Sequence, residues 1–73
     1  MDLNQAAVFV KVVQAGSFSA AARLLGLPTS TVSHRVMTLE KRLGVTLLQR
    51  TTRRLHLTEA GELYFAHAAT GLG

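Results

Sequence analysis

Apolar residues recur at the spacing of an α-helix through the first half of the chain. Over residues 3–14 they form a wide face, which predicts a helix at the centre of the core: Leu3, Ala6, Phe9, Val10, Val12 and Val13. Ala15 and Gly16 end this helix. Ser17 is a good N-cap for a second helix over residues 18–25, because its hydroxyl can accept a hydrogen bond from a first-turn amide.

The clearest period in the chain predicts a third helix over residues 29–43. Its apolar positions fall at i, i+4, i+7 and i+11 and form one stripe: Val32, Val36, Leu39 and Leu43. Gly26 lies where the chain reverses and needs a positive φ, and Pro28 sets φ for the new start. Thr29 or Ser30 is expected to cap this helix, and Gly44 to end it.

The pattern changes after residue 44. Residues 45–49 and 55–58 are β-prone and predict a two-stranded hairpin, whose tip, residues 50–54, is basic. Thr58 then caps a fourth helix, in which Glu59 and Glu62 suit the positive end of the helix dipole.

The second and third helices have the spacing of a helix-turn-helix. A small residue stands where the helices touch, a glycine in the turn, and apolar residues where the second helix is seated: Ala22, Leu25, Gly26, Leu27, Val32 and Val36. Any tight helical pair can show this spacing, but a basic hairpin directly downstream is typical of a winged helix. We expect a mainly α fold: a winged helix-turn-helix, with a three-helix core and a two-stranded β wing, followed by a fourth helix.

Positive charge is concentrated in one part of the chain. The net charge of all 73 residues is +4, yet residues 34–56 hold six cations against Glu40, a net charge of +5: Arg35, Lys41, Arg42, Arg50, Arg53 and Arg54. A basic segment of this kind in a small domain is the electrostatic footprint of a protein that binds phosphates.

The length and amino-acid composition of the chain exclude several other classes of protein. The chain has room for one small domain and no cysteine for disulfides or thiolate metal sites. No apolar run approaches the roughly 20 residues that span a bilayer, so we expect a cytoplasmic protein with no membrane partner. The spacing of the three histidines, His34, His56 and His67, is not that of metal ligands. No serine is accompanied by the general base and the orienting carboxylate that a catalytic triad needs. We therefore expect no metal, no cofactor and no catalytic residues, and hence a protein that is not an enzyme.

A longer series of positions resembles one known family. It comprises residues 15–22 (AGSFSAAA) with Leu25, then Val32-Ser33, Leu39-Glu40, Leu43-Gly44, Leu47-Leu48, Arg50-Thr51, Arg53, Leu57-Thr58 and Ala60-Gly61. In this order they are similar to the N-terminal domain of bacterial LysR-type transcriptional regulators, over residues 3–64. The resemblance implies sequence-specific binding of double-stranded DNA, with the third helix in the major groove and a linker helix that pairs two copies.

The resemblance also implies how the chain is organised. Residues 1–58 correspond to the winged helix-turn-helix, and residues 59–73 to the start of the linker or dimerisation helix. Members of the family carry a large C-terminal domain for a small-molecule effector, so we expect this sequence to be a piece of a longer, nucleoid-associated protein. We expect a homodimer through Leu63, Phe65 and Ala66, which lie on an apolar surface not needed to close the three-helix core, and a partly palindromic DNA site.

The positions expected to contact DNA fall into two groups. The family's groove contacts carry over to Thr29, Ser30, Ser33 and His34, and its wing contacts to Arg50, Thr51 and Arg53. Helical periodicity and charge add the outward-facing Met37 and Lys41 and the wing residue Arg54. For Met37, packing against the wing is favoured over contact with a thymine methyl group.

Two positions depart from the family's pattern. Many members have Ser-Gln where this chain has Pro28-Thr29, so a short hydroxyl replaces an amide that can pair bidentately with adenine. Many members have Arg where this chain has His34, so a permanent bidentate donor is replaced by a ring that is only partly charged near neutrality. We expect weaker base readout at Thr29 and weaker guanine or phosphate binding at His34.

A second class of function fits the same fold, because winged helices also serve as protein-interaction modules. The basic face would then meet an acidic partner. The polar row of the third helix favours DNA, since a protein-binding face should show apolar anchors such as Trp, Tyr or Leu.

Overall fold

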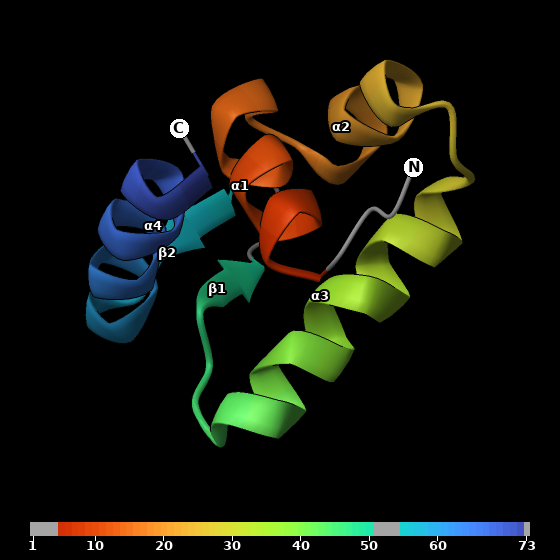
Figure 1. Ribbon diagram of the computed structural model, residues 1–73. Helices are drawn as coiled ribbons and strands as arrows, with labels where there is room; N and C mark the ends of the chain where they lie inside the picture. The colour runs from red at the N-terminus through yellow and green to blue at the C-terminus, as the bar shows by residue number, and fades with distance from the viewer. Residues whose placement is uncertain (1–4, 51–54, 73) are drawn as a thin grey trace.

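The computed structural model describes residues 5–50 and 55–72, which form helices and one hairpin. In chain order they are α1 (Gln5–Ala15), α2 (Phe18–Leu25), α3 (Thr29–Leu43), β1 (Leu48–Arg50), β2 (Leu55–Leu57) and α4 (Glu59–Leu72). Figure 1 shows α1 in the middle of the molecule, with α4 on one side of it and α3 on the other. The predicted order of three helices, a hairpin and a further helix is confirmed.

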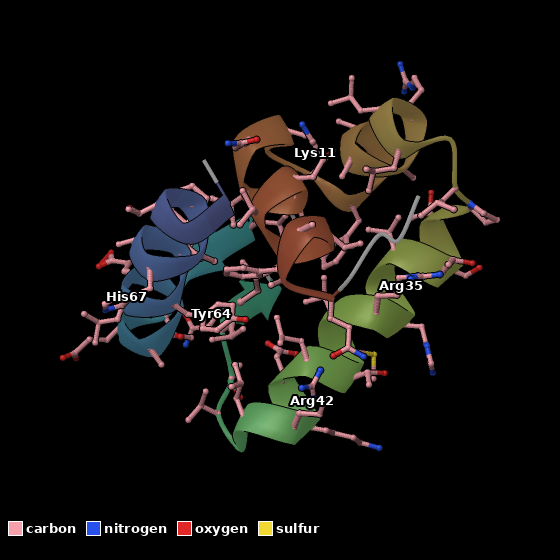
Figure 2. All side chains as sticks on the ribbon, viewed as in Figure 1. Lys11, Arg35, Arg42, Tyr64 and His67 are labelled. Atoms are coloured by element: carbon pink, nitrogen blue, oxygen red, sulfur yellow. The ribbon has the colours of Figure 1, made fainter. Side chains whose placement is uncertain are left out.

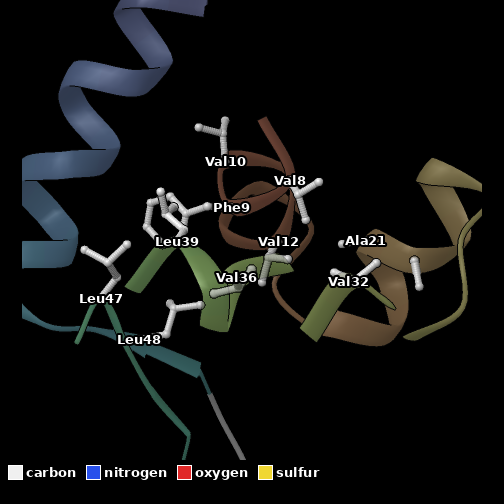
Figure 3. Packing of buried hydrophobic residues seen from close by; sticks show 11 residues of the cluster. Val8, Phe9, Val10, Val12, Ala21, Val32, Val36, Leu39, Leu47 and Leu48 are labelled. Atoms are coloured by element: carbon white, nitrogen blue, oxygen red, sulfur yellow. The ribbon is translucent and has the colours of Figure 1, made fainter. Parts of the chain in front are cut away.

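α1 is the spine of the core, as its wide apolar face predicts. Val8, Phe9 and Val12 of α1 are fully buried, together with Val32 and Val36 of α3. The same cluster also contains Val10, Ala21, Ala22, Leu39, Leu47 and Leu48 (Figure 3). Because α3 and α4 pack on different sides of α1, their outer faces point away from each other (Figure 1).

Local signals in the sequence set most of the helix ends. The Ser17 hydroxyl accepts a hydrogen bond from the Ala20 amide at 3.0 Å, which confirms the predicted N-cap of α2. Gly26 ends α2 with a φ of 70°, a left-handed conformation that glycine adopts without steric cost. The Thr58 hydroxyl accepts from the Gly61 amide at 2.9 Å and caps α4, also as predicted.

The start and end of α3 differ from the prediction. Pro28 occupies the N-cap position without a side-chain cap bond, and Thr29 is the first helical residue, so neither Thr29 nor Ser30 caps the helix. The φ of −61° at Pro28 already suits the helix start, and its carbonyl accepts from the Thr31 and Val32 amides. Leu43 is 42% exposed rather than buried, because the last turn of α3 runs past the core.

The hairpin is shorter than predicted. Its antiparallel pairs are Leu48 with Leu57, Gln49 with His56, and Arg50 with Leu55. Residues 45–47 lie outside the ladder because their backbone groups have other partners. The carbonyls of Thr46 and Leu47 accept hydrogen bonds from Thr58, and the Leu47 amide donates to the Glu40 carboxylate.

Among the described residues, no single helix is long and apolar enough to cross a membrane. α1 and α2 reach that length and composition only as a pair, and the pair is bent by 119°. Within the same ranges, no three His, Cys, Asp or Glu side chains gather where they could hold a metal ion.

Candidate nucleic-acid interface

The outward face of α3 is polar and accessible. Its exposed side chains include most of the predicted groove contacts: Thr29, Ser30, His34, Met37 and Lys41. Ser33 is half-buried on the flank of this face. The opposite side of the helix carries Val32, Val36 and Leu39, which are buried. The fold therefore uses one side of α3 for the core and leaves the other, hydroxyl-rich side exposed. The helix itself runs along one edge of the molecule (Figure 1).

An open groove runs between this face and the start of α1. It has a volume of about 500 Å³ and is lined by Gln5, Ser30, Thr31, His34, Arg35 and Thr38. Within it, the Thr38 hydroxyl donates to the His34 carbonyl at 2.9 Å. Thus the structure groups Ser30 and His34 with further polar side chains.

The predicted site lacked Gln5, Thr31 and Thr38 of this groove. The helical period could have identified the two threonines, since they lie on the flanks of the polar face. No sequence signal places Gln5 there, because it comes from another helix.

At the other end of α3, Met37 and Lys41 line a hollow of about 360 Å³ together with Glu40 and residues 44–46. Met37 is 46% exposed and Val45 is 43% exposed. Met37 therefore shares this hollow with the turn that follows α3, and the hairpin strands are not part of its lining.

Glu40 has a role that the sequence pattern did not indicate. One oxygen of its carboxylate, Oε2, accepts hydrogen bonds from the backbone amides of Leu47 at 2.8 Å and Leu48 at 3.1 Å. This links the third helix to the start of the hairpin. The available signal was that Glu40 is the lone carboxylate in a segment with six cations.

The cations of the basic segment differ in their surroundings. Arg42 donates from Nη1 to Gln5 Oε1 at 2.7 Å and so ties the end of α3 to the start of α1. Lys41 is exposed on the outward face, and Arg35 lines the groove beside Gln5. Arg35 on α3 and His67 on α4 lie on opposite sides of the molecule (Figure 2).

The wing residues are placed only in part. Arg50 ends β1, and Thr51, Arg53 and Arg54 lie outside the described residues. The neighbouring cross-strand pair Gln49 and His56 is exposed, so the hairpin presents polar side chains on one face.

The three residues of α4 that are predicted to form the dimer interface differ in their exposure. Leu63 is 63% exposed and Ala66 is also exposed. The Phe65 ring is half-buried instead, with its centroid 6.5 Å from that of Phe9 in an edge-to-face arrangement. The expectation that Phe65 is not needed by the core is wrong, because α4 packs on α1 through this ring and that of Tyr64.

Comparison with known proteins identifies the family. Residues 3–62 match the family described as "Bacterial regulatory helix-turn-helix protein, lysR family". The chain belongs to the LysR family. An HTH-type transcriptional regulator of Xanthomonas campestris pv. campestris (strain 8004) is 62% identical over 66 residues, 90% of this chain and 19% of that protein. CrgA of Neisseria meningitidis serogroup B (strain ATCC BAA-335 / MC58) is 57% identical over 61 residues, 84% of this chain and 20% of that regulator.

Solved structures of LysR-family proteins share the fold. The BenM DNA-binding domain in complex with catB site 1 DNA has a TM-score of 0.91 at 33% identity, covering 99% of this chain and 80% of that one. Full-length CbnR complexed with its target DNA has a TM-score of 0.89 at 35% identity, covering 99% of this chain and 25% of that one. These likenesses confirm the predicted winged helix-turn-helix followed by a further helix.

Membership of the LysR family also bears on activity. The family consists of bacterial transcriptional regulators and not of enzymes, and this chain is its DNA-binding helix-turn-helix region. The chain spans about a fifth of the length of the LysR relatives named above, 19% and 20%.

Proposed function

We propose that this LysR-family domain binds double-stranded DNA at specific sequences, with α3 in the major groove and the basic residues 50–54 on the backbone or in the minor groove. The observation that carries the proposal is the outward face of α3, where hydroxyl, imidazole and ammonium groups are exposed along one edge of the molecule. Such side chains hydrogen-bond base edges and phosphates. The BenM DNA-binding domain and CbnR, which share this fold, are both in complex with DNA, which supports DNA as the partner.

Individual roles follow from position along α3. Thr29 and Ser30, at the N-terminal end of the helix, and His34, one turn later, are proposed to face base edges, with Ser33 beside them. Lys41, at the far end, is proposed to contact phosphate, and Met37 a base methyl group. The wing residues Arg50, Thr51, Arg53 and Arg54 complete the proposed site.

A salt titration tests the proposal against binding of an acidic protein partner. If the domain binds duplex DNA, the logarithm of the binding constant falls with the logarithm of salt concentration, with a slope of about −0.9 per neutralised phosphate. Fluorescence anisotropy of a labelled random duplex measures this slope, with polyglutamate as the acidic competitor. Displacement of the protein from DNA by equimolar polyglutamate would contradict DNA as the preferred partner.

We expect His34→Arg to tighten DNA binding at pH 8. Arginine always carries its charge and presents a bidentate fork of donors, so the variant gains roughly 1–3 kcal/mol of charged base or phosphate contact. Fluorescence anisotropy of a labelled duplex measures the change, and His34→Gln, which cannot carry a charge, is the control that should bind no tighter than the parent. A His34→Arg variant that binds no tighter than the parent would contradict a contact between position 34 and the duplex.

We also propose that α4 pairs two copies of the protein and that residues 59–73 begin this linker helix, after a DNA-binding unit of residues 1–58. Leu63 and Ala66 are exposed one turn apart on α4, and α4 itself packs on the side of α1 away from α3 (Figure 1). Pairing would bring two α3 helices to half-sites about one helical turn apart, in a partial palindrome. As a bacterial transcriptional regulator the protein acts in the cytoplasm, where we propose that it is associated with the nucleoid.

Leu63→Glu is expected to prevent this pairing, because a charge would be buried at the centre of the interface. Ser19→Glu is the matched control, since it adds the same charge at an exposed position on another helix, α2. Sedimentation of each variant, free and on a two-half-site duplex, measures the outcome. A parent that stays monomeric in both settings at high concentration would contradict pairing through α4.

A further inference from the structure

Glu40 differs from the other charged residues of its segment in what it binds. It is the lone carboxylate among residues 34–56, where six cations surround it in sequence. Its Oε2 atom lies 2.8 Å from the Leu47 amide nitrogen and 3.1 Å from the Leu48 amide nitrogen, in a half-buried position. Hydrogen bonds to an ionised acceptor are shorter and about twice as strong as neutral ones. Glu40 therefore holds the first residues of the hairpin against the last turns of α3.

The residue that Glu40 holds is anchored on its other side as well. The Leu47 carbonyl accepts hydrogen bonds from the Thr58 amide at 3.0 Å and from the Thr58 hydroxyl at 3.3 Å. The Gly61 backbone packs directly against the same carbonyl. The side chains of Leu47 and Leu48 are buried in the core. Leu47 thus joins α3, through its amide, to the end of β2 and the start of α4, through its carbonyl.

From this junction we infer that Glu40 is a positioning residue for DNA binding: its carboxylate sets where the hairpin stands relative to the outward face of α3. The inference rests on the proposed function, in which α3 and the basic hairpin contact the same duplex. Two contact surfaces on one duplex must keep a fixed separation, since a misplaced hairpin loses its phosphates without changing what α3 can read.

The direction in which DNA affinity changes distinguishes a positioning role of Glu40 from a purely electrostatic effect of its charge. Removing a carboxylate from a DNA-binding domain lowers its negative charge and by itself favours binding to the polyanion. Glu62, exposed in the first turn of α4, provides the matched control for this charge effect. We expect Glu62→Gln to leave DNA binding equal or slightly tighter. Glu40→Gln removes the same charge but leaves an amide oxygen, which accepts from the two backbone amides more weakly than a carboxylate does, so we expect binding to weaken about tenfold.

The measurement is the salt dependence of duplex binding by the 73-residue chain and its variants, followed by fluorescence anisotropy. It is made at a temperature where circular dichroism shows that each protein is folded, so that unfolded protein does not lower the measured affinity. Glu40→Gln should lower the salt slope by about 0.9 for each phosphate that the hairpin no longer reaches. A residue that only stabilises the fold would leave this slope unchanged. Glu40→Asp, which keeps the charge on a shorter side chain, should give an intermediate loss and decides the matter if Glu40→Gln does not fold.

Two results would overturn the inference. One is a Glu40→Gln variant that binds as tightly as Glu62→Gln; the other is weaker binding with the parent's full salt slope. A parent chain that fails to bind duplex DNA is a different result, because it removes the proposed function rather than the role of Glu40 in placing the hairpin.

Discussion

Replacement of Gly61 by alanine is expected to destabilise the domain by about 3 kcal/mol, enough to unfold much of a protein this small. A Cβ atom at this position would lie 2.0 Å from the Leu47 carbonyl oxygen and 2.9 Å from its carbon. The Thr58 amide binds this carbonyl and the Glu40 carboxylate binds the Leu47 amide, so these backbone atoms cannot move aside cheaply. Denaturant unfolding followed by circular dichroism gives the free energy of unfolding.

Helix propensity and packing predict opposite changes in stability for Gly61→Ala. Gly61 lies inside α4, where helix propensity alone predicts that alanine stabilises by roughly 0.5–1 kcal/mol. Gly26→Ala is the control, because its Cβ would meet no atom within 4 Å and its cost comes only from the positive φ of 70°, about 1–2 kcal/mol. A Gly61→Ala variant as stable as the parent would show that α4 does not approach Leu47 as closely as described.

The second large effect is expected at Phe9, where alanine should cost roughly 3–5 kcal/mol. Phe9 is fully buried in α1, and its ring meets those of Tyr64 at 5.6 Å and Phe65 at 6.5 Å, centroid to centroid. Its removal leaves a cavity in the core and takes away the aromatic contacts that seat α4 on α1. The same unfolding measurement applies.

Tyr64→Leu is the matched comparison for Phe9→Ala. It removes one edge-to-face contact but leaves the centre of the core filled, so the expected loss is only about 1 kcal/mol. A Phe9→Ala variant that lost no more stability than Tyr64→Leu would contradict the placement of Phe9 between α1, α3 and α4.

The helices could be predicted from the sequence because their signals are local. The stripe of Val32, Val36 and Leu39 repeats at the helical period, and the structure buries all three. Ser17 and Thr58 could be identified as caps because the amides that they bind are three residues away. The exposed face of α3 follows from the same period, so Ser30, His34 and Lys41 could be named without coordinates.

What the sequence did not reveal depends on contacts between distant parts of the chain. The late start of β1 follows from bonds that Glu40 and Thr58 make to residues 46–48. From the sequence alone, Phe65 is an apolar residue with no partner in the core; its contact with Phe9 becomes evident only when α4 is packed on α1. Likewise, the share of Gln5 in the groove beside His34 requires α1 and α3 to be placed together. Periodicity does not carry this information, because each contact joins two different elements.

Sequence-specific binding of duplex DNA through α3 is the central claim, and a comparison of two dissociation constants tests it most directly. Selection from a random duplex pool yields the preferred sequence, and anisotropy at one salt concentration then compares this duplex with a scrambled version of the same composition. Two or more base contacts from the α3 face predict a preference of about a hundredfold or more, since each good contact discriminates by roughly 1–3 kcal/mol. Equal affinity for the two duplexes would contradict the claim.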